Sequence, residues 1–141
     1  MKQTISIIGI ILIITFIWSN SYQDGTNSIK SSMFFTSNIQ PLLIKLGFHP
    51  NLIIMDSYIR KMAHLTEFMA LGAVIYYTFK QLFNTYIVTK SILLSIFIAS
   101  LDEFIQIYTP GRTSNITDIL IDTTGAIIGI LIIRALTKSS D

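Results

Sequence analysis

Four apolar segments follow one another along the sequence, at approximately residues 3–18, 59–79, 88–102 and 116–136. The first is rich in Ile, begins next to Lys2 and ends at Trp18, which is typical of a membrane helix and its interfacial ends. It is slightly shorter than the roughly 20 residues of a span, so a cleaved signal peptide is the alternative there, although we favour a retained span. The pattern predicts an all-α integral membrane bundle of about four transmembrane helices.

The stretch between the first two apolar segments, residues 19–57, is polar at first and then moderately amphipathic. Pro41, Gly47 and Pro50 are expected to break it into short pieces, none of them long enough to cross a membrane. We interpret this amphipathic extracytoplasmic segment as an ordered loop or an interfacial helix that lies on the bilayer surface.

Composition supports a membrane protein and excludes several functions. The chain has 141 residues, which suits one domain over residues 1–141, and only 13% of them are charged. Soluble domains have about 25% charged residues. A net charge of +2 without a long basic run gives no support for a nucleic-acid partner. The absence of cysteine excludes disulfides, thiolate metal sites and a cysteine nucleophile.

The basic residues near the segment ends predict the orientation in the cytoplasmic membrane. Arg112 is the only basic residue in the short loop between the third and fourth segments. On the opposite side of a four-span arrangement lie Lys2, Lys80, Lys90, Arg134 and Lys138. Because basic residues favour the cytoplasmic side, both termini are predicted to be cytoplasmic, with the long first loop as a partial exception.

Ionisable side chains interrupt the apolar segments at their predicted outer ends. Arg60, His64 and Glu67 are spaced i, i+4 and i+7 and therefore share one helix face. Asp102 shares a face with Gln106 and ranks above Glu103, which points about 100° away. In the fourth segment Asp118, Asp122, Gly125 and Gly129 share a face, and the last two form a GxxxG packing motif.

These outer ends would bring distant residues to one membrane depth. Ionisable groups at such a depth are costly and are functional candidates by default. Arg60 and Arg112 are expected to pair with the carboxylates. The candidate ligand-binding or polar-network residues are Arg60, Lys61, His64, Glu67, Asp102, Glu103, Gln106, Arg112, Asp118 and Asp122.

The order of several motifs resembles the VanZ-like family of bacterial membrane proteins. The matching pieces are RKMAHLTEF at residues 60–68, DEFIQ at 102–106, PGR at 110–112, and the spacing of Asp118, Asp122 and Gly125. The segment WSNSYQ after the first apolar run is also similar. Ile105 stands where the family often has a His beside the Gln, which bears on any metal site. One member is linked to low-level teicoplanin resistance, so the resemblance implies a role at the cell envelope.

The sequence leaves three roles open for the polar residues. The first role is binding of an envelope ligand, such as a cell-wall precursor or a glycopeptide, next to membrane lipid. The second is a small hydrolase or transferase, with His64 as base and Glu67, Asp102 and Asp122 as metal ligands or acid–base groups. No GxSxG or HExxH signature is present, and no particular metal or cofactor is indicated. The third role is a structural network that joins three helices or binds a partner.

Overall fold

The computed structural model describes residues 2–138 and consists of helices and connecting loops in that range. The helices are α1 (Lys2–Ser21), α2 (Gly25–Lys45), α3 (Leu52–Leu82), α4 (Ile87–Ile107) and α5 (Ile116–Lys138). The predicted all-α fold is thus confirmed. Residues 1 and 139–141 of the predicted domain lie outside the described residues, as do the side chains of Lys2 and Lys138 used in the charge count.

Two polar segments that the sequence placed at span ends or in loops are helical. α1 continues past Trp18 to Ser21, and α4 carries the whole DEFIQ motif before it ends at Ile107. The connection between α4 and α5 is therefore only residues 108–115. Polar residues extend these helices because their side chains bond to neighbouring helices, as described below.

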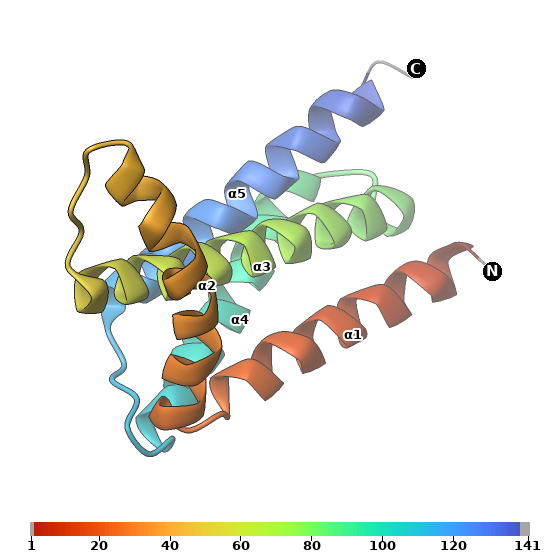
Figure 1. Ribbon diagram of the computed structural model, residues 1–141. Coiled ribbons are helices and arrows are strands. Elements are labelled where there is room, and N and C mark those ends of the chain that lie inside the picture. The colour runs from red at the N-terminus through yellow and green to blue at the C-terminus, as the bar shows by residue number, and fades with distance from the viewer. Residues whose placement is uncertain (1, 139–141) are drawn as a thin grey trace.

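α2 is a single helix of 21 residues, so the expected break at Pro41 is wrong. Asp24 caps its first turn, and hydrogen bonds from the Thr26 hydroxyl and the Asn27 backbone N–H lower the pKa of Asp24. A proline inside a helix lacks one backbone hydrogen-bond donor, and its ring clashes with the preceding turn. It can therefore kink a helix without ending it. The direction of α2 changes along its length in Figure 1.

The long helices run between two ends of the molecule (Figure 1). At one end Gln3 Nε2 donates to Gln81 O at 3.1 Å, and Lys80 Nζ donates to Thr137 O at 3.0 Å. The beginning of α1, the turn between α3 and α4, and the end of α5 therefore meet there. The end of α1, α2, the start of α3, the end of α4 and the start of α5 meet at the other end, which contains the candidate site.

α3 and α5 pack at backbone distance. A Cβ atom at Gly125 would collide with Leu65 O, and one at Gly129 would collide with Met69 O. On the α3 side, Gly72 lies against the backbone of Ala126 in the same way. Small residues permit such an approach between membrane helices, so the predicted packing role of the GxxxG motif is confirmed.

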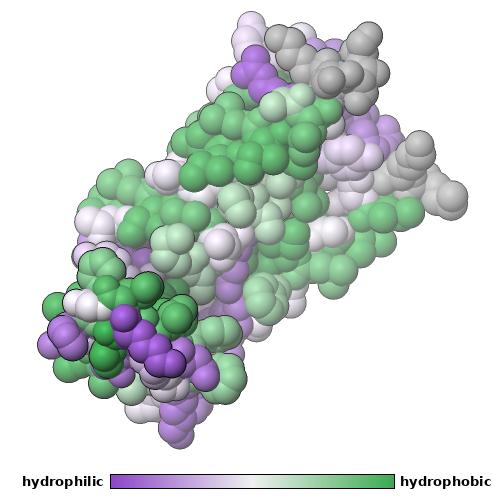
Figure 2. Space-filling model, turned by 45° about the horizontal axis from the view of Figure 1, so that its top comes forward, coloured by the Kyte–Doolittle hydropathy of each residue, from purple (hydrophilic) through white to green (hydrophobic). Residues whose placement is uncertain are grey.

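The molecule has polar groups inside and apolar groups outside. Side chains that are completely buried include Thr36, Thr78, Ser91, Ser95 and Asp102. In contrast, Ile5 and Leu12 of α1 are both 63% exposed, and Leu93 of α4 is 62% exposed. Figure 2 shows broad hydrophobic areas on one face, with hydrophilic residues mostly toward the two ends. Contiguous apolar surface of this extent indicates contact with lipid.

Among the described residues, two helices have the length and apolar composition of a membrane span, at Gln3–Ser21 and Ile116–Thr137. α1 also contributes Ile17 to the core formed with Phe68, Leu71, Ile98 and neighbouring residues. The segment at the start of the chain is therefore an integral part of the bundle.

Replacing Gly129 with Ala should destabilise the protein by about 1–3 kcal/mol, because its methyl group has no room against Met69 O. Gly9→Ala is the matched control, since its Cβ would meet Val74 Cγ1 at an ordinary 3.5 Å. This control should be neutral or stabilising by up to about 1 kcal/mol, because Ala favours helices more than Gly does. Unfolding in detergent micelles checks both values, and equal effects would contradict the proposed close packing.

Candidate functional site

A polar pocket of about 290 Å³ opens at the end of the bundle where α3 begins, α4 ends and α5 begins. It is lined by eight of the ten predicted residues, namely Arg60, Lys61, His64, Glu103, Gln106, Arg112, Asp118 and Asp122. Glu67 lines an adjoining cavity of about 240 Å³. Asp102 is completely buried beside His64. The structure thus brings all ten residues to the same end.

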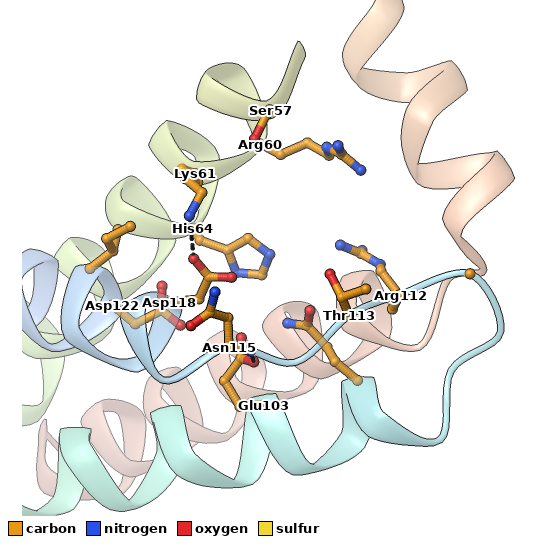
Figure 3. Close-up of a pocket in the computed structure, with 13 residues that line it drawn as sticks. Ser57, Arg60, Lys61, His64, Glu103, Arg112, Thr113, Asn115, Asp118 and Asp122 are labelled. Carbon is orange, nitrogen blue, oxygen red and sulfur yellow. Dashed lines mark hydrogen bonds and ion pairs between the residues drawn. The ribbon is translucent and has the colours of Figure 1, made fainter. Parts of the chain in front are cut away.

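The basic residues have different partners from those expected. Arg60 Nη2 lies 3.3 Å from Asp56 Oδ2, one turn earlier on the same helix. Lys61 Nζ lies 2.6 Å from Asp118 Oδ1 and joins α3 to α5 (Figure 3). The prediction that Arg60 and Arg112 would pair with the clustered carboxylates is therefore wrong. Lys61 is the basic residue that forms an ion pair with a carboxylate of the cluster.

Arg112 is held by backbone carbonyl groups. Its Nη2 donates to Asn20 O at 3.0 Å and its Nε to Gln23 O at 3.4 Å, both at the corner between α1 and α2. Among the described residues, no carboxylate lies within ion-pair distance of it. Partial burial, together with the charge of Arg60, lowers the pKa of Arg112, which still remains a cation at neutral pH.

The loop that carries Arg112 is positioned by two glycines. Gly25 N donates to Pro110 O at 2.9 Å, and a Cβ at Gly25 would collide with Gly111 O. Gly111 itself has a φ of 73°, a left-handed conformation that favours glycine. The start of α2 and the Pro-Gly turn therefore fix the guanidinium in place, pointing toward Arg60 across the pocket (Figure 3).

Three carboxylates of the cluster receive hydrogen bonds, and each has a donor on another element. Asp102 Oδ2 accepts from Ser21 Oγ at 2.8 Å and from Gln106 Nε2 at 3.0 Å. Glu67 Oε1 accepts from Asn20 Nδ2 at 2.9 Å, which links α3 to α1. Because the loop into α5 passes over the side of α4 that carries Glu103, this carboxylate is also buried.

Glu103 Oε2 accepts the backbone N–H of Asn115 at 2.9 Å, although the sequence ranked it below Asp102. The Asn115 side chain accepts from Thr117 N at 3.0 Å and so caps the start of α5. Glu103 therefore fixes the entry into α5 as well as lining the pocket.

Other polar atoms of the cluster have no hydrogen-bond partner among the described residues. They are His64 Nδ1, Glu67 Oε2, Asp102 Oδ1 and both carboxylate oxygens of Asp122. Buried polar groups in proteins are nearly always paired, so each exception requires an explanation. An imidazole and carboxylates in this setting are suited to hold a metal ion or to transfer protons.

Asn20 and Ser21 also belong to this site, although neither was predicted as a candidate residue from the sequence. Both were assigned to a polar loop after the first span, whereas they lie on the last turn of α1 and bond to Glu67 and Asp102. The available signal was the similarity of WSNSYQ to the corresponding segment of the VanZ-like family. Thr109 was also missed, and its hydroxyl donates to Ser21 O at 3.3 Å.

The sequence that forms this fold and site matches a known protein family over nearly its whole length. A family model described as VanZ/LLP1 matches residues 6–137, which is nearly the whole chain. This chain belongs to the VanZ/LLP1 family. No match was found among curated proteins or solved structures. Family membership, together with the two apolar helices long enough for a span, identifies a VanZ-like membrane protein.

Replacing Ser21 with Ala should destabilise this VanZ-like protein by about 1–3 kcal/mol, because buried Asp102 loses a hydrogen-bond donor. Ser19→Ala is the matched control, since that hydroxyl is exposed and bonds only to Phe16 O of its own helix, so about 0.5 kcal/mol or less is expected. Unfolding in micelles measures both. In an Asp102→Asn background the Ser21 effect should shrink, and an unchanged effect would show that the pair is not coupled.

Proposed function

We propose that this protein is a multi-pass protein of the cytoplasmic membrane that binds an anionic, lipid-linked envelope precursor near the outer surface. By holding that precursor, it would alter susceptibility to teicoplanin-type lipoglycopeptides. In this proposal α1, α3, α4 and α5 cross the membrane and both termini are cytoplasmic. The polar pocket then opens near the extracytoplasmic surface, with α2 lying across it.

The observation that carries the proposal is the environment of Arg112. This partly buried guanidinium bonds to two carbonyl oxygens and has no carboxylate partner among the described residues. It lines both the polar pocket and the adjoining cavity, as Arg60 does. A planar guanidinium without a counter-charge is well suited to a phosphate oxygen.

The cavities have linings suited to a lipid chain as well as to a charged head group. An apolar groove of about 550 Å³ lies between α2 and the start of α3, lined by residues such as Phe35, Ile39, Ile54, Tyr58 and Met62. The adjoining cavity shares Phe35 and Ile59 with this groove, and it shares Arg60, His64 and Arg112 with the polar pocket. The charged lining of the polar pocket therefore continues through the adjoining cavity into the apolar lining of the groove.

This continuity favours an amphiphile over a soluble anion. A phosphate held by Arg60 and Arg112 would place its lipid chain along the groove under α2, in contact with the bilayer. The proposal thus accounts for α2, which lies over α3 at the site end but is not among the candidate spans. An amphipathic helix in that position can cover a lipid chain and still present polar residues to water.

A second candidate function is hydrolysis or group transfer on the same ligand. It is favoured by His64 and Asp122, which line the polar pocket and have buried atoms without hydrogen-bond partners. His64 would act as base and the carboxylates as metal ligands or acid–base groups. Turnover of a radiolabelled polyisoprenyl diphosphate by the purified protein, abolished by His64→Gln, distinguishes this function from binding alone.

Arg112→Gln should weaken binding of a polyisoprenyl diphosphate in micelles by about 10- to 100-fold, the equivalent of one charge-assisted contact. Arg60→Gln should have a similar effect. Arg134→Gln, a matched removal of charge on the exposed part of α5, should leave affinity unchanged. Titration calorimetry with polyisoprenol, which lacks phosphate, and with inorganic phosphate separates the contributions of head group and chain. Equal affinity for diphosphate and alcohol would contradict the proposal.

Two adjacent isoleucines test the groove. Ile54 lines it, whereas Ile53 is 81% exposed and does not. Ile54→Asn should therefore weaken binding of the long-chain diphosphate but not of a short-chain analogue, while Ile53→Asn should change neither. The same calorimetric titration provides the measurement. If both variants lose affinity equally, the chain does not lie in this groove.

Susceptibility tests whether binding has the proposed consequence. A strain that lacks the gene should become more sensitive to teicoplanin, and wild-type protein or the Arg134→Gln variant should restore resistance. The Arg112→Gln variant should fail to do so at equal abundance in the membrane, because it no longer holds the precursor. Minimum inhibitory concentrations with immunoblots of membrane fractions decide the result, and unchanged susceptibility after deletion would contradict the proposed role.

A further inference from the structure

Side chains from three different helices meet beside the polar pocket, which two of them line. They are His64 of α3, Asp102 of α4 and Asp122 of α5, and each offers one ligand atom within 4.8 Å of the other two. His64 Nδ1 lies 3.9 Å from Asp102 Oδ2. The cluster is therefore a product of the tertiary fold.

The least satisfied member of the cluster is Asp122. Asp122 is only 1% exposed, and neither of its carboxylate oxygens receives a hydrogen bond from the described residues. The nearby basic residues do not supply an ion pair, because Lys61 binds Asp118 and Arg60 binds Asp56. An isolated buried carboxylate is very costly, whereas coordination to a cation satisfies it.

Asp102 is oriented as a metal ligand commonly is. Its Oδ2 accepts hydrogen bonds from Ser21 and Gln106, while its Oδ1 has no partner among the described residues. Outer hydrogen bonds that hold one part of a ligand and leave the other free are a regular feature of metal sites. His64 Nδ1 is likewise buried without a partner.

We propose that His64, Asp102 and Asp122 together bind one divalent first-row transition-metal ion. One imidazole nitrogen and two carboxylate oxygens suit such ions, and three protein ligands leave a further position for water or substrate. Two ligands at about 2.1 Å from an ion lie at most about 4.2 Å apart, so the side chains must close by less than about 1 Å. Ile105, where the family often has His, is not needed for this set.

The site is accessible from the pocket, since both His64 and Asp122 line it. An ion there would lie in the same pocket as Arg60 and Arg112. It would add positive charge to a lining in which three basic side chains face the three carboxylates of Glu103, Asp118 and Asp122. Metal binding does not depend on the proposed lipid ligand and is measured without it.

The test uses full-length protein purified in detergent with a tag free of histidine, stripped with EDTA and then titrated with Zn²⁺ and Mn²⁺. We expect one ion per chain by mass spectrometry of the metal content, with Zn²⁺ bound more tightly than Mn²⁺. Asp122→Asn and His64→Gln should each lose at least about 100-fold in affinity. Ser21→Ala should lose about 10- to 100-fold through its hold on Asp102.

Asp24→Asn is the matched control, because it removes a carboxylate that caps α2 and lines neither the polar pocket nor the adjoining cavity, while Asn keeps a capping oxygen. It should keep wild-type metal affinity. The wild-type unfolding temperature should rise with Zn²⁺, and that of Asp122→Asn should not. Wild-type protein that takes up neither ion, or an Asp24→Asn variant as impaired as Asp122→Asn, would overturn the metal site. Intact binding of polyisoprenyl diphosphate in that case would leave the proposed function standing.

Discussion

The burial of carboxylates among apolar helices is the constraint on which the rest of this structure depends. Asp102 and Asp122 are 0% and 1% exposed on helices whose outer faces are largely hydrophobic. A carboxylate removed from water must find its partners within the protein. Asp102 finds them in Ser21 and Gln106, which joins the end of α1 to α4. This requirement explains why α1 does not end at Trp18.

The same constraint acts through the packing of α3 against α5. Gly125 lies against Leu65, the residue that follows His64, and Asp122 precedes Gly125 by nearly one helical turn on the same face. A larger side chain at position 125 would separate the two helices and move Asp122 away from His64. The small residues that hold the bundle together therefore also set the distances within the polar cluster.

Sequence patterns predicted the parts of the structure that depend on local periodicity. Hydropathy located α1, α3, α4 and α5, and the spacing of Gly125 and Gly129 predicted the contact with α3. Helix ends were less predictable, because α1 and α4 continue through polar residues that are satisfied only by other helices. The partners of Arg112 could not be predicted, since its loop is held by Gly25 from a distant part of the chain.

A network whose only task was to join helices would leave its own members satisfied. The bonds of Asn20 to Glu67 and of Ser21 to Asp102 meet that description and do stabilise the bundle. Asp122 does not meet it, because its buried carboxyl group has no hydrogen-bond partner among the described residues, and an apolar residue of similar size should be more stable there. Arg112 likewise has no counter-charge among the described residues. Under the two proposals, a cation beside Asp122 and an anion beside Arg112 would satisfy both groups.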